Sequence, residues 1–422
     1  MIQLARPGAV HSVYECPCAE ITCISYSRLV ADSTIREIEL TQIPPGSPGV
    51  ATAFDALSEA LANEQVFAPI PQQSRHYSSH QIQAIREAIN PSTPCHSHTA
   101  AILTTSGSTG NPRGVELSYS QLSAMNDFVN SGEVVGVQLD APPQWICALP
   151  VTSVGGVNVL TRSIAAGVPP IALESIAGGS TFDPDEFANS VERSKDEPVF
   201  VSLVPTQLRR LLNSQLGAQA LRRCTAILIG GGPTPTNDFL QAQDLGLPVS
   251  YTYGMTETSG GCIFSGKNGP GTNFTLDPAD SRITLHGPSI ASGYRPIGGR
   301  AFTPFNSTFA TDDFGVADLI GQLEILGRLD DIVVINGVNI SRTAIAKIIE
   351  ENPSVQSCYV LPNLTALIVA APADFEGVSG SIRHQIVQKL GSIAIPAFRV
   401  VTQLPTLPNG KLDRVTITNL YG

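Results

Sequence analysis

The chain has 422 residues, which is more than one ordinary domain uses and suits two or three domains. Its residues are 42% hydrophobic and only 14% charged, so the chain can bury a large core and is not of the disordered class. The formal net charge of −11 argues against a general nucleic-acid binder, because such proteins need a basic face for the phosphate backbone.

The N-terminal segment MIQLARPGAVHSVYECPCAE has one early arginine and no apolar run of signal-peptide length. No stretch of about 18 or more apolar residues occurs in the sequence, so we expect no membrane span and a cytoplasmic protein. Among the cysteines, only Cys16, Cys18 and Cys23 form a cluster, and no second cluster lies at zinc spacing. We therefore expect reduced, free thiols.

Residues 100–255 alternate short apolar runs with helical patterns. Ser118 can cap a helix whose Leu122, Met125 and Val129 fall on one face. This alternation predicts an α/β sheet with both faces covered, and ligands in such sheets bind at the carboxyl ends of the strands. The pattern predicts strands over 100–107, 145–150, 199–205, 225–231 and 249–254, and helices over 206–216 and 236–245.

The remaining chain changes character twice. Residues 265–327 are rich in Gly, Pro, Ser and Thr, with short apolar runs that predict a small β subdomain. After residue 331 a new α+β unit begins, because strand-like and helix-like segments alternate again. Its predicted strands cover 332–336, 354–362, 365–372 and 398–405, and its helices lie around 341–352 and near 380–391. The predicted organisation is a large domain over 1–327, a hinge over 328–331 and a C-terminal domain over 332–422.

A hydroxyl-rich and glycine-rich loop, TTSGSTGNPRG, covers residues 104–114. Glycines let backbone N–H groups approach an anion, hydroxyls donate to its oxygens, and the Arg113 guanidinium adds a forked cation. The loop is not a Walker motif, because Gly114 is followed by Val115 and Glu116 instead of a lysine and a hydroxyl. The loop therefore predicts a triphosphate site, with candidate residues Thr105, Ser106, Gly107, Ser108, Thr109, Gly110 and Arg113.

Further segments with suitable chemistry follow in order along the chain. In Tyr253-Gly254-Met255-Thr256-Glu257, the tyrosine can stack on a base, the threonine can donate to a phosphate oxygen, and the glutamate can hold Mg²⁺. A carboxylate in 311–313 can accept the two hydroxyls of a ribose. In 408–414, Lys411 follows an Asn-Gly turn and can neutralise charge as a carboxylate attacks phosphorus. Each segment alone also fits an ordinary turn or an exposed charge.

Together these segments resemble the motifs of the adenylate-forming superfamily, which contains acyl-CoA synthetases, luciferases and peptide-synthetase adenylation domains. The resemblance covers residues 104–414 and implies layered α/β sheets with a β subdomain and a small mobile C-terminal lid. It also implies ATP and Mg²⁺, with coenzyme A as co-substrate. The implied roles are adenine for Gly230, Gly231, Gly232, Tyr253 and Gly254, ribose for Asp313 and Arg328, metal for Glu257, hinge for Asp330, and catalysis for Lys411, Thr256 and Arg113.

The sequence departs from this pattern in places. Asp312 stands where the superfamily has glycine, so either Asp312 or Asp313 could hold the ribose. Val333-Val334 replace the usual Ile-Lys, and Ala344 and Ala346 replace acidic residues, which affects contacts of the second lid conformation.

The segment LPVTSVGG over 149–156 resembles the acyl pocket of the superfamily, with Ser153 where many relatives have histidine. Segments 160–163 and 202–208 are similar to o-succinylbenzoate–CoA ligases of menaquinone synthesis, and the short N-terminal region is similar to their actinobacterial type. The implied acid is an aromatic carboxylic acid, o-succinylbenzoate, bound near Ser153, Gly155 and Arg162. Either Arg162 or Arg209 could meet a second carboxylate.

Other readings stay open from the sequence. One is a different aryl- or acyl-CoA ligase, or a stand-alone adenylation enzyme that loads a carrier protein. Another is a non-catalytic nucleotide-binding relative, and a third is a P-loop hydrolase, which the missing Lys and hydroxyl disfavour. A homodimer is compatible with the sequence but not indicated by it.

Overall fold

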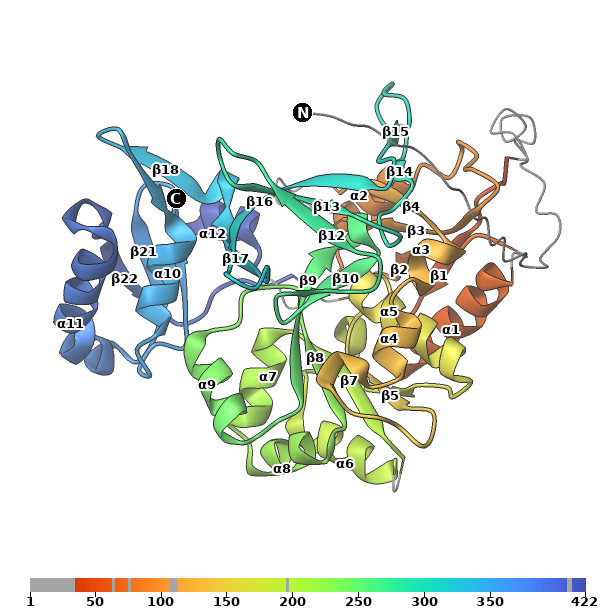
Figure 1. The fold of residues 1–422 in the computed structure, drawn as a ribbon, viewed down its shortest axis with the longest axis horizontal. Coiled ribbons are helices and arrows are strands. Elements are labelled where there is room, and N and C mark those ends of the chain that lie inside the picture. Colours follow the sequence, from red (N-terminus) through yellow and green to blue (C-terminus); the bar gives the residue numbers. More distant parts are fainter. Residues whose placement is uncertain (1–34, 63–64, 75–76, 106–111, 195–196, 408–411) are drawn as a thin grey trace, which may run out of the picture.

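The computed structural model describes residues 35–422 except 63–64, 75–76, 106–111, 195–196 and 408–411 (Figure 1). Its largest sheet has the strand order β11-β10-β9-β8-β7-β5-β6. The strands from β6 to β9 are parallel, whereas β10 and β11 are added antiparallel. The strands are β5 Gln144–Cys147, β6 Ile171–Ala172, β7 Val199–Leu203, β8 Ala226–Ile229, β9 Val249–Met255, β10 Gly260–Phe264 and β11 Lys267–Asn268.

Helices connect the parallel strands and confirm the predicted α/β alternation. The helix predicted over 206–216 is two helices, because Ser214 accepts a hydrogen bond from Gly217 N at 3.2 Å and so caps a new helix. The helices of this layer are α5 Val154–Ala166, α6 Pro184–Arg193, α7 Pro205–Leu212, α8 Gln215–Arg223 and α9 Thr236–Asp244.

A second sheet, of order β15-β14-β4-β3, contains the hairpin on either side of the hydroxyl-rich loop. Beside it, β1 and β2 form a parallel pair. Ser118 caps a helix with Gln121 in a capping box, as predicted, but this helix ends at Ser123 and a second one follows. The elements are β1 Leu40–Ile43, β2 Ala68–Pro71, β3 Thr99–Thr104, β4 Gly114–Ser118, β14 Gly293–Tyr294, β15 Thr303–Pro304, α1 Ser47–Leu61, α2 Ser79–Ile89, α3 Tyr119–Ser123 and α4 Asn126–Asn130.

Residues 265–327 are rich in strands, as predicted, but they do not form one separate sheet. Four of their strands form the antiparallel sheet β12-β13-β16-β17, whereas β14 and β15 join the β3–β4 hairpin. The bounds are β12 Asn273–Leu276, β13 Arg282–His286, β16 Thr308–Ala317 and β17 Leu323–Arg328. This arrangement brings residue 294 beside the hydroxyl-rich loop.

The C-terminal elements gather at one end of the molecule, drawn in blue, where α10 lies next to α9 (Figure 1). Helix α11 begins earlier than predicted, with a proline in its first turn, where the missing N–H costs nothing. The elements are β18 Ile332–Ile335, β19 Val338–Ser341, β20 Ser357–Val360, β21 Thr365–Val369, β22 Ala397–Val401, α10 Arg342–Glu350, α11 Pro372–Leu390 and α12 Arg414–Tyr421. Short 3₁₀ turns are η2 Glu133–Val135, η3 Ile176–Gly178, η4 Thr256–Thr258, η5 Leu329–Asp331 and η6 Ser392–Ala394.

The buried apolar side chains fall into separate clusters. The buried members of the largest cluster lie between residues 43 and 323, and those of the main C-terminal cluster lie between residues 340 and 394. The cysteines at 95, 147, 224, 262 and 358 are buried and free, as expected, whereas Cys16, Cys18 and Cys23 lie outside the described residues. Among the helices described, none is both long and apolar enough to cross a membrane.

Candidate active site

Tyr253, Asp313 and Arg328 meet where β9 faces the β12-β13-β16-β17 sheet. The Tyr253 hydroxyl donates to Asp313 Oδ2 at 2.8 Å, and Arg328 Nη1 lies 3.4 Å from Asp313 Oδ1. Asp313 and Arg328 are cross-strand partners on β16 and β17. Thr311 fixes the backbone at Asp313, because its hydroxyl donates to Ile283 O at 2.9 Å and accepts from Asp313 N at 3.0 Å.

Asp312 and Asp313 point to opposite faces of β16, as successive residues of a strand do. The Asp312 side chain is 64% exposed and lies 3.5 Å from Arg282 and 3.7 Å from Arg328, whereas the Asp313 side chain is 12% exposed. Burial raises the pKa of Asp313, although Tyr253 and Arg328 oppose that rise. Burial and the charge of Asp313 also raise the pKa of Tyr253, so its hydroxyl keeps its proton and acts as a donor. The geometry therefore groups Asp313, and not Asp312, with Tyr253.

The motif 253–257 ends β9 and turns into η4 with its polar residues buried. Thr258 closes the turn, because its hydroxyl accepts from Met255 N at 2.9 Å and donates to Gly260 O at 2.7 Å. A Cβ on Gly254 would lie 1.8 Å from Gly260 O, so only glycine fits there. Thr256 and Glu257 are each 9% exposed, and Glu257 Oε1 accepts a hydrogen bond from the Tyr294 hydroxyl at 2.6 Å.

The hydroxyl-rich loop leaves and rejoins the β3–β4 hairpin at a closed stem. Thr105 N donates to Arg113 O at 2.9 Å, and Arg113 N donates to Thr105 Oγ1 at 3.1 Å. The Arg113 guanidinium carbon lies 3.2 Å from the centre of the Tyr294 ring, a cation–π contact. The candidate residues Ser106, Gly107, Ser108, Thr109 and Gly110 lie outside the described residues.

The glycine turn after β8 lies against β9. A Cβ on Gly230 would come within 2.3 Å of Thr252 Oγ1, so a side chain there would displace the residue next to Tyr253. Gly231 has φ +85°, which glycine adopts without strain, and a Cβ on Gly232 would meet open space. The turn therefore presents backbone close to the tyrosine of the motif.

The segment resembling an acyl pocket leads into α5, which contacts the residue after η4. Ser153 donates from Oγ to Pro150 O at 2.8 Å and directly precedes α5. A Cβ on Gly155 would lie 3.1 Å from Leu149 Cδ1, which is tight packing. Asn158, one turn into α5, donates to Ser259 O at 2.9 Å. The beginning of α5 thus contacts the turn that carries Glu257.

The two candidate arginines for a second carboxylate differ in their partners. Arg209 Nε lies 2.8 Å from Asp238 Oδ2, so this cation is already paired. Arg162 is 4% exposed, its guanidinium carbon lies 5.4 Å from the Trp145 ring centre, and its Nε has no hydrogen-bond partner in the described part of the chain. Burial lowers the pKa of Arg162 to about 10, so the side chain stays charged at neutral pH.

The predicted hinge residue Asp330 is held by a two-point ion pair. Arg328 Nε and Nη2 lie 2.8 and 2.9 Å from the two carboxylate oxygens of Asp330. Burial opposes ionisation of Asp330, but the hydrogen bonds and charge of Arg328 outweigh it and lower the pKa of this carboxyl.

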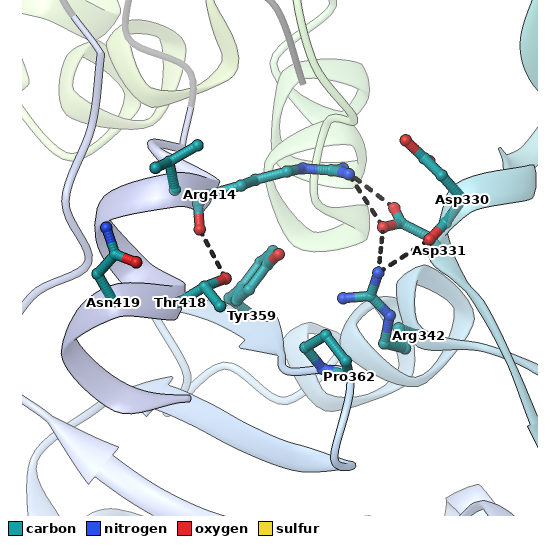
Figure 2. A pocket seen from close by; sticks show the side chains of 9 residues that line it. Asp330, Asp331, Arg342, Tyr359, Pro362, Arg414, Thr418 and Asn419 are labelled. Carbon is teal, nitrogen blue, oxygen red and sulfur yellow. Dashed lines mark hydrogen bonds and ion pairs between the residues drawn. The ribbon is translucent and has the colours of Figure 1, made fainter. Parts of the chain in front are cut away.

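The next residue, Asp331, joins three segments of the C-terminal part (Figure 2). Its Oδ1 lies 2.9 Å from both Arg342 Nη2 and Arg414 Nη1, and its Oδ2 accepts from Arg414 Nη2 at 3.0 Å and from Thr343 Oγ1 at 2.9 Å. Arg342 Nη2 also donates to Asp330 O at 3.1 Å. Asp331, Arg342 and Arg414 line a pocket of roughly 330 Å³. Lys411, three residues before Arg414, lies outside the described residues.

The residues present fit a magnesium ion bound together with a nucleotide. No group of three or more His, Cys, Asp or Glu side chains suited to a metal occurs within the described residues. Mg²⁺ needs no such group, because it commonly binds through one or two carboxylates plus phosphate oxygens and water. Glu257 supplies one buried carboxylate near the stem of the loop, with one oxygen on Tyr294.

Tyr294 was not among the residues singled out from the sequence. The signal that could have found it is weak, since a Gly-Tyr pair in a region rich in glycine and proline predicts little more than a short strand. Its importance comes from pairing with β4, which local pattern does not show.

Two named ligases are similar in sequence to this chain. A probable 2-succinylbenzoate–CoA ligase of Mycobacterium tuberculosis strain CDC 1551 / Oshkosh is 32% identical over 334 residues, covering 76% of this chain and 84% of that protein. A 2-succinylbenzoate–CoA ligase of Listeria innocua serovar 6a is 30% identical over 340 residues, covering 75% and 69%.

Two solved structures show the same fold at low identity. The o-succinylbenzoate CoA synthetase (MenE) of Bacillus subtilis, in complex with the acyl-adenylate intermediate OSB-AMP, has a TM-score of 0.66 at 20% identity, covering 90% of this chain and 88% of that one. ATP-bound MatB of Rhodopseudomonas palustris has a TM-score of 0.67 at 19% identity, covering 94% and 98%. Residues 29–294 match the family described as AMP-binding enzyme. This chain therefore belongs to the AMP-binding enzyme family.

Proposed function

We propose that this chain is an ATP-dependent acid–CoA ligase that activates o-succinylbenzoate as an acyl-AMP and transfers the acyl group to coenzyme A. The observation that carries the proposal is the meeting of Tyr253, Asp313 and Arg328 from separate strands, with the Tyr253–Asp313 hydrogen bond at 2.8 Å. The substrate rests on the relatives named 2-succinylbenzoate–CoA ligase at 32% and 30% identity.

The nucleoside part of ATP is assigned to this polar cluster. The Asp313 carboxylate is buried and paired with a cation, so it can accept two ribose hydroxyls while Arg328 holds it in place. The Tyr253 ring and the backbone of Gly230, Gly231 and Gly232 flank the position of the adenine. Because these groups come from β8, β9, β16 and β17, the protein fixes them before the ligand binds.

The triphosphate is assigned to the loop whose stem is closed by Thr105 and Arg113, together with Thr256 and Glu257. When bound, Mg²⁺ supplies charge neutralisation for the phosphate oxygens, with Glu257 as its protein ligand. Arg113 is exposed beside the loop and offers a forked donor to the leaving pyrophosphate. Thr256, the first residue of η4, is assigned as a donor to a phosphate oxygen.

The chemical step is the attack of the acid's carboxylate on the α-phosphorus, which forms a C–O–P bond and expels pyrophosphate. Lys411 is assigned to the developing negative charge of this step. Stabilisation of that kind is often the largest contribution to catalysis. The thiol of coenzyme A then attacks the acyl carbon and releases AMP.

The acid is assigned to Ser153, Gly155 and Arg162. The buried Arg162 guanidinium, whose Nε has no hydrogen-bond partner within the described residues, suits a ligand that brings its own carboxylate, and o-succinylbenzoate has two. Arg209 is assigned a structural role, because Asp238 already satisfies it.

The domain division 1–327 and 332–422, with a hinge at 328–331, is part of the proposal. It is supported by the two clusters of buried side chains and by the polar segment between them. Rotation at Asp330 would bring Lys411 to the α-phosphate. Further rotation would then move Lys411 away and admit the thiol of coenzyme A. A cytoplasmic location stays a prediction from the sequence.

The test is acid-dependent pyrophosphate release with ATP and Mg²⁺ over a panel of aryl, fatty and dicarboxylic acids, with and without coenzyme A. We expect release with o-succinylbenzoate, and a thioester only when coenzyme A is added. Pyrophosphate release with a different acid only would replace the proposed substrate. Transfer of the acyl group to a carrier protein instead of coenzyme A would replace the proposed acceptor. No pyrophosphate release with any acid of the panel would contradict the enzyme assignment.

The role of Arg162 is tested in the same assay with Arg162→Gln and Arg209→Gln as a matched pair. We expect Arg162→Gln to raise KM for o-succinylbenzoate by about 10-fold to 100-fold, as expected when a charged hydrogen-bond partner is lost, with little change for a monocarboxylic acid. Arg209→Gln should leave the ratio between the two acids unchanged. Equal effects of the two substitutions would show that Arg162 does not read the second carboxylate.

A further inference from the structure

Tyr294 joins the two groups that are assigned to the triphosphate and its metal. On one side its hydroxyl donates to Glu257 Oε1 at 2.6 Å. On the other side its ring lies 3.2 Å below the guanidinium carbon of Arg113. One side chain therefore contacts both the end of the phosphate loop and the proposed metal ligand.

The position of Tyr294 is fixed by the strand that carries it. It pairs with Val115 on β4, and Arg295 N donates to Gly114 O at 2.8 Å, so its backbone follows the exit of the phosphate loop. The neighbouring Arg295 is fully buried, with Nη1 2.6 Å from Glu116 Oε1. A buried and paired arginine beside Tyr294 leaves the strand little freedom to shift.

The surroundings of the Tyr294 ring also hold it in one orientation. Its centre lies 4.7 Å from that of Phe305, with the rings perpendicular at 88°. The backbone N–H of Ala291 donates to Glu257 O at 2.9 Å, so the segment before Tyr294 runs alongside η4. Both ends of the Tyr294–Glu257 contact are thus anchored.

The hydroxyl of Tyr294 donates its hydrogen bond to one oxygen of Glu257, Oε1. A phenol donor beside a carboxylate occupies one oxygen and leaves the other oxygen for a further ligand.

We propose that Tyr294 is a positioning residue for the pyrophosphate-forming step, because it orients Glu257 toward the magnesium–triphosphate and steadies Arg113 beside the phosphate loop. The inference rests on the proposed function, in which Glu257 binds the metal. Partners that orient a metal ligand usually affect metal affinity by about 10-fold to 100-fold, whereas an exposed cation–π contact contributes less.

Two substitutions separate the two contacts. Tyr294→Phe removes the hydroxyl but keeps the ring under Arg113, and Tyr294→Leu removes both. Tyr251→Phe is the matched control, because Tyr251 is a half-buried tyrosine on β9 whose ring packs against Phe239, away from Glu257. Thermal unfolding of all variants checks that they fold.

The first readout is ATP binding by calorimetry with and without Mg²⁺, which needs no turnover. We expect Tyr294→Phe to reduce the gain in ATP affinity given by Mg²⁺ by about 10-fold or more, with nearly unchanged affinity in the absence of metal. Tyr294→Leu should also weaken metal-free ATP binding by about 2-fold to 5-fold. Wild-type Mg²⁺ dependence in a folded Tyr294→Phe variant would overturn the inference.

The second readout divides the reaction into its two halves. We expect pyrophosphate release by Tyr294→Phe to need more Mg²⁺, while thioester formation from preformed acyl-AMP and coenzyme A proceeds at the wild-type rate. Equal loss in both halves would indicate a merely structural role and overturn the inference. If the wild-type chain binds ATP but activates no acid, the proposed function fails while the calorimetric comparison still decides the role of Tyr294.

Discussion

The parts of the molecule before residue 328 and after residue 331 hold their polar groups in different ways. In the first part, Tyr253 and Asp313 lie on strands packed over one large apolar cluster, so the sheets fix where they point. In the second part, a single carboxylate, Asp331, ties together the hinge, α10 and α12 through two arginines (Figure 2). Strands therefore position the Tyr253–Asp313 pair, whereas ion pairs position Asp331.

Helix α9 of the first part meets α10 of the second part through polar contacts. Asn237 on α9 donates to the backbone oxygens of Glu350 and Glu351 at the end of α10, both at 3.2 Å. Interfaces of this kind suit parts that move relative to each other. In the proposed function, substrate binding belongs to the first part, and the second part carries Lys411.

The largest effect should come from the C-terminal lysine. We expect Lys411→Ala to slow pyrophosphate release by about 10²-fold to 10³-fold, because it removes the charge assigned to the attacked phosphate. The control is Lys389→Ala, which removes an exposed lysine paired with Glu351. A normal rate of release in Lys411→Ala would show that the second part contributes no charge to the first half-reaction.

The next largest effect concerns the ion pairs of Asp331. Asp331→Ala leaves Arg342 and Arg414 without their carboxylate, and we expect it to lower the free energy of unfolding by about 3 kcal/mol. Asp330→Ala removes an exposed pair and should cost less than about 1 kcal/mol. Denaturant titration measures both. Similar costs for the two substitutions would mean that the second part is not organised around Asp331.

A pH dependence should arise at the contact between the two parts. Burial raises the pKa of Glu350 to about 7, Asp238 raises it further, and the backbone N–H of Cys358 and the charge of Arg209 oppose the rise. A carboxyl with a raised pKa in the folded state contributes stability below about pH 4.5 that is lost as the pH rises through about 7. We expect wild type to lose about 2 kcal/mol of stability relative to Glu350→Gln between about pH 4.5 and 8.

This expectation is checked by unfolding titrations at several pH values. Glu351→Gln serves as control, since Glu351 is the neighbouring carboxylate and is paired with Lys389 on the surface. Parallel pH profiles for wild type and Glu350→Gln would show that Glu350 titrates as an ordinary surface carboxyl.

The smallest expected effect tests the hinge itself. Asp330→Pro should slow thioester formation from preformed acyl-AMP by about tenfold while sparing pyrophosphate release, because proline fixes the backbone angle about which the lid would rotate. Asp330→Ala separates this effect from loss of the Arg328 pair. Equal loss of both half-reactions in the proline variant alone would contradict rotation at this residue.

Local sequence pattern predicted much of the fold. The strands before Gly230 and within 249–254 follow from apolar runs, and these runs place the glycine turn and the Tyr253 motif at strand ends. Prediction from local sequence pattern fails where packing between distant segments decides the structure. Leu122 and Val129 are buried as predicted. The helix between them is interrupted at Met125, so two short helices form instead of one.

The site was less predictable because its contacts join distant segments. The choice between Asp312 and Asp313 depended on which face of β16 meets Tyr253, and no local pattern reports that face. The burial of Arg162 was also hidden, since charged side chains are seldom buried. Tyr294 escaped notice because its role depends on β14 pairing with β4.

That pairing has a consequence for folding kinetics. Arg295 and Glu116 are 179 positions apart in the chain, so the strands beside Arg113 can close only after most of the chain has been synthesised. Contacts of such sequence separation carry a large loop-closure entropy and tend to form slowly. During refolding, helical circular dichroism should therefore recover before Mg²⁺-dependent ATP binding, because the protein acquires its nucleotide site among its last native contacts.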